Sequence, residues 1–240
     1  MISRVLILDI PGHICSNWGQ LVPSEPRRKQ SRTARGFSLT KSSTAIPITA
    51  PVARLARELE SISGQGLGDR KFIQSAEPAL RRLLAGEDFL PAEATRPSAK
   101  SYARHLLHAD PEDRFCLAAM VWAPGQGTPI HDHDGTWGMI GMIQGSLEVV
   151  DFFSAGAEIA SGELALRSEP PHVPRADSSG CVCGCADIHS VNNPFGETAI
   201  SLHVYARELE RCHVFDPISE KDGRYMVSEK TLTYTDNPSS

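Results

Sequence analysis

The sequence predicts a mainly β domain with helices packed against its N-terminal side. Apolar residues at helix spacing are confined to about residues 50–110, and short apolar runs separated by Gly, Pro and Asp fill about residues 111–235. No helical pattern separates these runs. Strands that follow one another at this spacing favour an antiparallel sandwich or barrel.

The first 48 residues differ from the remainder in charge. The stretch up to Ser43 contains only two acidic residues, Asp9 and Glu25, and three prolines interrupt it. Its basic residues include Arg27, Arg28, Lys29, Arg32, Arg35 and Lys41. We expect residues 1–48 to form a poorly ordered basic extension. A targeting leader is the alternative, because such leaders are rich in Arg and Ser and poor in acids, but no clear amphipathic helix accompanies this composition.

Two helices are predicted after this extension. Pro51 suits the first turn of a helix, and the apolar residues Val52, Leu55, Ala56 and Leu59 recur behind it. A second apolar stripe ends before Gly86 and consists of Phe72, Ile73, Ala76, Leu80, Leu83 and Leu84. The segment 102–108 suits either a third helical piece or the first strand. We therefore expect a helical cap over about residues 50–110.

The barrel is predicted from six apolar runs rich in Val, Ile, Leu and aromatic residues. They read FCLAAMVW, GMIGMIQG, SLEVVDFF, AISLHVY, CHVF and RYMV. Together with the cap, they predict one domain over residues 49–240, with the β-barrel at about 111–235.

Composition excludes several classes of partner. Apolar residues make up 40% and charged residues 22% of the chain, which suits a packed core. No stretch approaches the roughly 18 apolar residues of a membrane span, and a net charge of −5 with a pI of about 6.0 gives no basic field for nucleic acid. The six cysteines do not have the spacing of a bridged secreted scaffold, which favours free thiols in a reducing cytoplasm. We expect a monomer or small homo-oligomer that acts on a small molecule.

The stretch IHDHDGTWG at residues 130–138 carries the main chemical signal. Within a strand, His131 and His133 would point to the same face, with Asp132 and Asp134 on the other. Gly125 and Gly145 flank the pair at the spacing of the first cupin motif: Gly, five residues, His-x-His, four residues, Glu, six residues, Gly. Gly138 stands where that motif has its glutamate.

A third histidine completes the predicted metal site. His189 and Asn193, in DIHSVNN, resemble the His-x-x-x-Asn of the second cupin motif. Three neutral imidazoles without the carboxylate of the usual Fe(II) triad leave the full charge on a divalent metal, which favours an anionic ligand such as a thiolate. The other histidines lack this context and are expected on the surface or in the core: His13, His105, His108, His172 and His213.

Ser201, His203 and Tyr205 alternate in SLHVY, so they can form a hydrogen-bonded row on one strand face. With the two histidine motifs, this row resembles the thiol dioxygenases, the cysteine dioxygenase family of cupins, over residues 102–215. The resemblance implies a jelly-roll-like barrel in which Fe(II) is held by His131, His133 and His189. It also implies that O2 oxidises a small thiol to a sulfinate, with Tyr205 giving a hydrogen bond or proton near the oxygen.

The segment YAR at residues 102–104 resembles the Tyr-x-Arg segment of the family. This implies that Arg104 pairs with the substrate carboxylate and that Tyr102 lines the same pocket. Animal members carry a cysteine at the place of Gly138, so no thioether to Tyr205 is expected. PGQGTPIHDH followed by TWG is similar to bacterial 3-mercaptopropionate dioxygenases, yet those have glutamine in place of Arg104. The substrate stays open between cysteine and 3-mercaptopropionate.

Three alternatives remain. The cysteines of CVCGC at 181–185 could hold zinc or form a redox switch, although small residues on a strand leading to His189 explain them more simply. A non-catalytic cupin sensor is a second alternative. Burying the polar row of Ser201, His203 and Tyr205 without a function would cost desolvation free energy, which argues against this alternative. A dioxygenase for a larger mercapto acid such as mercaptosuccinate is the third, and it needs another basic residue in the pocket, with Arg207 and Arg211 as candidates.

Overall fold

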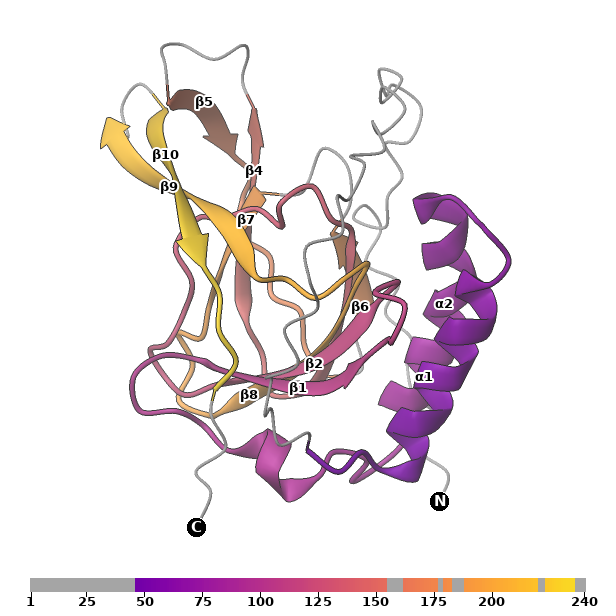
Figure 1. Ribbon diagram of the computed structural model, residues 1–240. Helices are drawn as coiled ribbons and strands as arrows, with labels where there is room; N and C mark the ends of the chain where they lie inside the picture. Colours follow the sequence, from indigo (N-terminus) through magenta and orange to yellow (C-terminus); the bar gives the residue numbers. More distant parts are fainter. Residues whose placement is uncertain (1–45, 155–161, 177–178, 183–187, 220–222, 236–240) are drawn as a thin grey trace. The chain divides into compact units, whose positions relative to one another are not determined.

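The computed structural model describes residues 46–154, 162–176, 179–182, 188–219 and 223–235 (Figure 1). All of them belong to one compact unit, Thr44–Ser240. The extension predicted for residues 1–48 lies outside the described residues up to position 45 and stays a prediction there. Ile46 is buried in the hydrophobic core.

Two helices precede the sheets. The helix α1 (Ala50–Ser63) begins after Thr49, whose hydroxyl accepts a hydrogen bond from the Val52 amide at 3.5 Å. The helix α2 (Asp69–Leu84) packs against α1 beside the sheets (Figure 1) and contacts β3 (Gly138–Gln144), and a short 3-10 helix, η2 (Ala92–Thr95), follows. The helices bury the predicted apolar stripes. No helix among the described residues is long and apolar enough to cross a membrane.

Two five-stranded antiparallel sheets form the remainder, in the orders β1-β2-β8-β3-β6 and β7-β4-β5-β10-β9. The strands are β1 (Ala103–Ala109), β2 (Cys116–Trp122), β3 (Gly138–Gln144), β4 (Glu148–Ser154), β5 (Glu163–Ser168), β6 (Ser179–Val182), β7 (Ile188–Asn192), β8 (Ala199–Tyr205), β9 (Arg211–Ser219) and β10 (Arg224–Thr231). This confirms the predicted class, mainly β with N-terminal helices.

The main difference from the expected elements is at the start of the first sheet. Segment 102–108 is not helical; Ala103–Ala109 forms β1, so strands begin before residue 111. The physical reason is pairing, because β1 runs antiparallel to the fully buried β2, with Arg104 opposite Met120. Each of the six predicted apolar runs contributes to a strand.

Strand β8 has two differently used faces. Leu202 and Val204 pack into the large core that includes the helices, whereas Ser201, His203 and Tyr205 point to the barrel interior. One strand therefore serves both the hydrophobic core and a polar interior.

The second sheet is closed by the segment that carries the histidine motif. Its two edge strands are β7 and β9, and His131 bridges His189 on the first and Val214 on the second. The His131 amide donates to the His189 carbonyl at 2.9 Å, and the Phe215 amide donates to the Ile130 carbonyl at 3.0 Å. The expectation that His131 and His133 share a regular strand is wrong: only isolated bridges form, and His133 lies just before a turn.

Candidate active site

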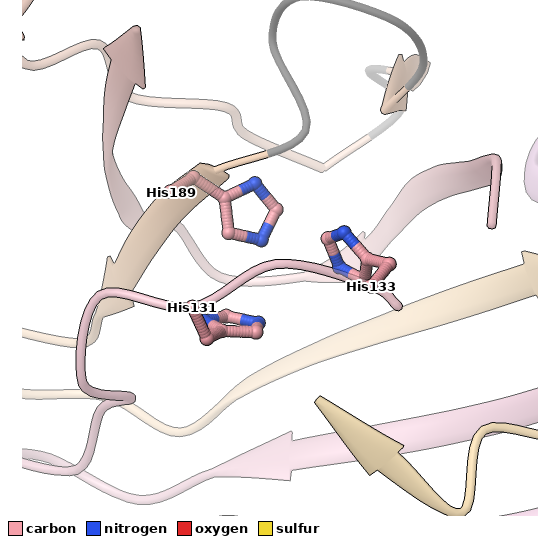
Figure 2. Close-up of side chains that lie close together, drawn as sticks. All are labelled: His131, His133 and His189. Carbon is pink, nitrogen blue, oxygen red and sulfur yellow. The ribbon is translucent and has the colours of Figure 1, made fainter. Parts of the chain in front are cut away.

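His131, His133 and His189 converge as predicted (Figure 2). One ligand nitrogen from each lies within 4.8 Å of the others, and the ring centroids are 4.8 to 5.2 Å apart. His133 and His189 are buried, while His131 is partly exposed. This is the only group of potential metal ligands found in the described part of the chain.

The protonation of these rings suits metal binding. The Nδ1 atom of His131 lies 3.1 Å from the Pro129 carbonyl, so an N–H there can donate and leave Nε2 as the ligand. Burial, with repulsion from His133, lowers the pKa of His131 to about 3, and burial also lowers the pKa of His189. Both rings are neutral at physiological pH, which is the state that binds a cation.

The row on β8 is hydrogen-bonded throughout. The Ser201 hydroxyl lies 2.8 Å from His203 Nε2, and the Tyr205 hydroxyl lies 2.9 Å from His203 Nδ1. The indole N–H of Trp122 donates to Ser201 Oγ at 3.0 Å. Burial lowers the pKa of His203 to about 3 and raises the pKa of Tyr205, so both groups stay neutral.

Tyr205 connects this row to the metal-ligand group. Its ring lies 5.6 Å from the ring of His133. It also lies directly against Gly138, its register partner on β3: a Cβ atom at 138 would be 2.9 Å from two carbons of the Tyr205 ring. Because Gly138 has no side chain, the Tyr205 ring can occupy the space beside it.

Arg104 lies in the same interior, on β1, and is 5% exposed. Its guanidinium makes only long contacts, 3.4 Å to the Thr233 carbonyl and 3.5 Å to the Leu209 carbonyl, and lies 4.9 Å above the ring of Tyr234. No ion pair joins Arg104 to a carboxylate of the described residues. A buried cation with such weak partners is suited to an anionic ligand.

One cavity joins these groups. Tyr102, Arg104, the three histidines, His203 and Tyr205 all line it. Tyr102 stacks on Trp122 at 4.4 Å, and burial raises its pKa. Ser201 is not among the residues that line the cavity, and its hydroxyl contacts Nε2 of His203, the ring nitrogen that does not face Tyr205.

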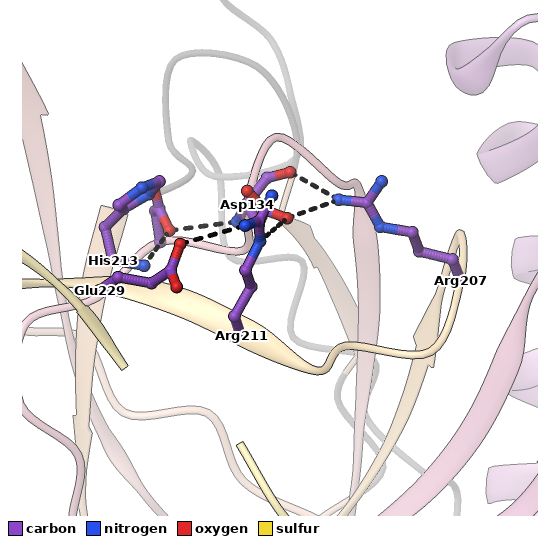
Figure 3. Close-up of polar contacts among 6 residues, drawn as sticks. Asp134, Arg207, Arg211, His213 and Glu229 are labelled. Carbon is purple, nitrogen blue, oxygen red and sulfur yellow. Dashed lines mark hydrogen bonds and ion pairs between the residues drawn. The ribbon is translucent and has the colours of Figure 1, made fainter. Parts of the chain in front are cut away.

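The two aspartates of the motif belong to a separate polar network (Figure 3). Asp132 accepts from the backbone N–H of His213 and lies against its Nδ1, both at 2.8 Å. Asp134 Oδ2 accepts from Arg207 at 2.9 Å and from Arg211 at 3.1 Å. Asp134 lies away from the cavity, as expected, whereas Asp132 is one of the residues that line it, so the expected outward direction is wrong for Asp132. Neither arginine lines the cavity, which corrects the idea that one of them supplies a pocket cation.

Several site residues escaped the sequence interpretation. Trp122, Cys212, Lys230 and Leu232 line the cavity, and Thr233, Tyr234 and Thr235 surround Arg104. The C-terminal residues lie far from the motifs in sequence and carry no spacing signal of their own. Only Trp122, at the end of a strongly apolar run, could have been suspected, because a buried indole N–H needs an acceptor.

The remaining predicted residues have structural surroundings. Asn193 is 1% exposed and donates to the carbonyls of Trp122 and Glu197, both at 2.8 Å, so it fixes the loop between β7 and β8. His105 is buried and bonded to the Arg96 carbonyl, as expected for a core histidine. The side chains of the CVCGC segment lie outside the described residues, as does His13.

The part of the chain that holds the site matches a known protein family. A family model described as cysteine dioxygenase type I matches residues 96–218, just over half of the chain. The chain belongs to the cysteine dioxygenase type I family. This confirms the resemblance to the thiol dioxygenases of the cupin superfamily, and the matched range holds all eight predicted site residues.

Individual relatives of the cysteine dioxygenase type I family support this assignment. Cysteine dioxygenase type 1 of Homo sapiens is 32% identical over 116 residues, which are 48% of this chain and 56% of that protein. The proteins of the same name from Rattus norvegicus and Danio rerio are 29% and 27% identical over the same length. The chain thus spans a little over half the length of the curated relatives it matches.

Solved structures give weaker likenesses. A crystal structure from Thermus thermophilus has a TM-score of 0.37 and 18% identity, covering 48% of this chain and 90% of that one. An oxalate oxidase in complex with glycolate has a TM-score of 0.35 and 19% identity, covering 51% and 62%. Both scores lie below 0.5, so neither structure informs the function.

Proposed function

We propose that the protein is an iron-dependent thiol dioxygenase that adds both atoms of O2 to the sulfur of a small carboxylated thiol and forms a sulfinic acid. The observation that carries this proposal is the shared cavity. It brings together three metal-type histidines, a buried polar row and an arginine without a carboxylate partner among the described residues.

The three histidines fit a divalent iron. They offer three imidazole nitrogen ligands and no carboxylate among them, which leaves coordination positions for other ligands. When bound, Fe(II) would supply a centre that favours the thiolate form of the substrate and reacts with O2. Family membership in the cysteine dioxygenases supports the same metal.

The residues around the metal have separate roles in this proposal. Arg104 holds the substrate carboxylate with its planar guanidinium, and Tyr102 forms the wall beside it. The row of Ser201, His203 and Tyr205 keeps a phenol proton at Tyr205 Oη, because burial raises the pKa of that group. The phenol can donate a hydrogen bond to the reacting oxygen atoms.

The test is anaerobic loading with Fe(II), followed by oxygen uptake with cysteine and with 3-mercaptopropionate. We expect one sulfinate for each O2 consumed. No sulfinate from any small thiol would contradict the proposal. Binding of both metal and thiol without oxygen uptake would instead favour the non-catalytic sensor.

Arg104→Gln tests the carboxylate site. KM should rise at least tenfold for every carboxylated thiol, because the guanidinium lies buried with only weak internal contacts. Cysteamine, which has no carboxylate, is the control and should keep its KM. Equal effects on both kinds of thiol would remove Arg104 from substrate recognition.

The charge of the cavity favours a mercapto acid over an amino acid. Asp132 is the one acidic residue that lines the cavity in the described structure, and its carboxylate is already bonded to His213. An α-ammonium group would therefore meet Arg104 and Lys230 without a free carboxylate to balance it. We propose 3-mercaptopropionate as the preferred substrate of the two.

A dicarboxylic thiol such as mercaptosuccinate is a second candidate, and Lys230 is the observation that favours it. Lys230 and Leu232 are alternate residues that both line the cavity, and the lysine lies on the exposed side of it. Lys230→Met should raise KM for mercaptosuccinate several-fold and leave KM for 3-mercaptopropionate unchanged. The same KM for mercaptosuccinate in both proteins would exclude this role.

We place this activity in the cytoplasm, without nucleic acid or membrane partners, in a monomer or small homo-oligomer. Cys116 and Cys212 are buried free thiols, which suits a reducing compartment. We also propose that residues 49–240 form the catalytic domain, preceded by the basic extension.

A further inference from the structure

Asp134 follows the metal-type residue His133 directly, and Figure 3 shows the arginines that contact it, neither of which lines the cavity. Asp134 is the first central residue of a tight turn in which the Thr136 amide donates to the His133 carbonyl at 3.0 Å. Asp134 and Gly135 have φ values of 52° and 66°, as in a type I′ turn. The orientation of His133 therefore depends on how this turn is held.

Two arginines hold the turn. Arg207 donates from one nitrogen, Nη2, to both the carboxylate and the backbone carbonyl of Asp134, each at 2.9 Å. Arg211 donates from Nε to the same carboxylate at 3.1 Å, and its other end contacts Glu229 on β10 at 3.1 Å. The turn is thus tied to the start of β9 and, through Glu229, to β10.

The position of Arg207 in the chain gives these contacts a role in the site. Tyr205 is the last residue of β8, and Arg207 comes two residues after it. The hydrogen bond from Arg207 to Asp134 therefore connects the strand that carries Tyr205 to the turn that follows His133. His133 and Tyr205 are neighbours, with ring centroids 5.6 Å apart. Movement of the turn would change the spacing between these two rings.

Fold stability does not explain the arrangement. The side chains of Arg207 and Arg211 are 40% and 55% exposed, and exposed ion pairs contribute little to the stability of a fold. Groups that orient metal ligands, in contrast, commonly change metal affinity 10- to 100-fold when they are removed.

We propose that Arg207 and Arg211 are positioning residues that grip Asp134 and so fix His133 for metal binding beside Tyr205. The inference rests on the proposed function only in taking the three histidines as the metal site. It assigns the two arginines to the ligand turn rather than to the substrate.

The test compares Co(II) binding to metal-free protein, measured by titration and by the visible absorption of the bound ion. We expect Arg207→Gln to weaken Co(II) about tenfold, and the double variant Arg207→Gln with Arg211→Gln to weaken it more. Arg207→Lys should stay within about threefold of wild type, because a single nitrogen makes both bonds to Asp134.

Two further variants make the comparison specific. Arg81→Gln removes an exposed ion pair with Glu77 on α2, 48% and 36% exposed, and should leave Co(II) affinity unchanged. Asp134→Asn combined with Arg207→Gln should weaken Co(II) by less than the product of the two single effects, because both substitutions disturb the contact between Arg207 and the Asp134 carboxylate. The measurements are made well below the unfolding temperature of each variant.

Co(II) affinities of Arg207→Gln and of the double variant within twofold of wild type, with unchanged spectra, would overturn the inference. The Co(II) titration does not depend on whether the protein oxidises a thiol substrate. A wild-type protein that binds Co(II) and, loaded with iron, forms no sulfinate removes the proposed function and leaves the positioning role intact.

Discussion

Trp122 determines which atoms donate and which accept in the hydrogen bonds of the row Ser201, His203 and Tyr205. An indole N–H can only donate, so Ser201 Oγ is an acceptor in that bond and its own proton is available for His203 Nε2. A neutral His203 then carries its proton on Nδ1 and donates it to Tyr205 Oη. The Tyr205 proton is left to point into the cavity, toward the reacting oxygen atoms.

Trp122→Phe tests this chain of donors. Without the indole N–H, the serine hydroxyl loses its fixed orientation and His203 can adopt the other tautomer. We expect kcat to fall about fivefold, since such hydrogen bonds contribute on the order of 1 kcal/mol, whereas iron content stays at the wild-type level. Unchanged kcat with full iron loading would show that the direction of the chain is not needed.

Gly138→Ala tests the space beneath the Tyr205 ring. The new Cβ atom would lie 2.9 Å from ring carbons Cδ1 and Cε1, so the ring must tilt and its hydrogen bond to His203 must lengthen. We expect a loss of kcat of tenfold or more, with Co(II) affinity within threefold. Gly196→Ala, where an added Cβ meets nothing within 4 Å, is the matched control.

At the residue scale, short local spacing patterns pointed to the three histidines and the row, whereas Tyr102 and Arg104 came from the resemblance of YAR to a family segment. Sequence spacing could not place Arg207 and Arg211, since their partner Asp134 is more than 70 positions away. It also could not find Trp122, whose task depends on the register of β2 against β8.

The C-terminal segment is the element that completes the arginine site. After β10 the chain returns over β1: the Arg104 amide donates to Thr235 Oγ1 at 3.0 Å, and the Thr235 amide donates to the Arg104 carbonyl at 2.8 Å. This pairing places the ring of Tyr234 against the guanidinium. The segment thereby holds Arg104 in one orientation.

Tyr234→Ala tests this support. Removing the ring takes away a cation–π contact of about 0.5–2 kcal/mol, so KM for a carboxylated thiol should rise roughly two- to thirtyfold. Tyr234→Phe keeps the ring and should behave as wild type. If the alanine variant keeps the wild-type KM, the ring has no part in orienting Arg104.

Element prediction succeeded where one pattern dominated. The two helices followed from apolar spacing, the fully buried β2 from a continuous apolar run, and the fully buried β8 from a run of apolar residues interrupted only by Ser201 and His203. β1 was ambiguous because ARHLLHA mixes polar and apolar residues, and only its pairing with β2 decides it. The regular strand expected at 131–133 failed because the turn at Asp134 ends the pairing.

The whole domain carries a cluster of buried neutral histidines, and this makes its stability depend on pH. The pKa of His131 and of His203 is about 3 in the folded protein, against an ordinary 6.5 in the unfolded chain, and the pKa of His189 is also lowered. Below pH 6.5 the unfolded chain binds protons that the folded protein excludes. The free energy of unfolding must therefore fall as pH decreases from 6.5 toward 3.

Urea unfolding of the metal-free protein between pH 7 and 5 measures this effect. Each such histidine contributes a slope of up to about 1.4 kcal/mol per pH unit below its unfolded pKa. His203→Gln should reduce the slope by about one proton, because it removes one of these groups. Identical slopes for the variant and the wild type would show that His203 binds its proton as readily in the folded protein as in the unfolded chain.

Closure of the second sheet by residues 130–132 has a kinetic consequence. The backbone of His131 bridges His189 on β7 and Val214 on β9, and we call this connection between the two edge strands the seam. The backbone of His131 cannot leave the site while the hydrogen bonds of the seam are intact. Amide hydrogens at His131, His189 and Phe215 should exchange with solvent only when the seam opens. The dissociation rate of a bound metal ion would then be set by the same rare opening. Each hydrogen bond that stabilises the seam would lengthen the residence time of the ion.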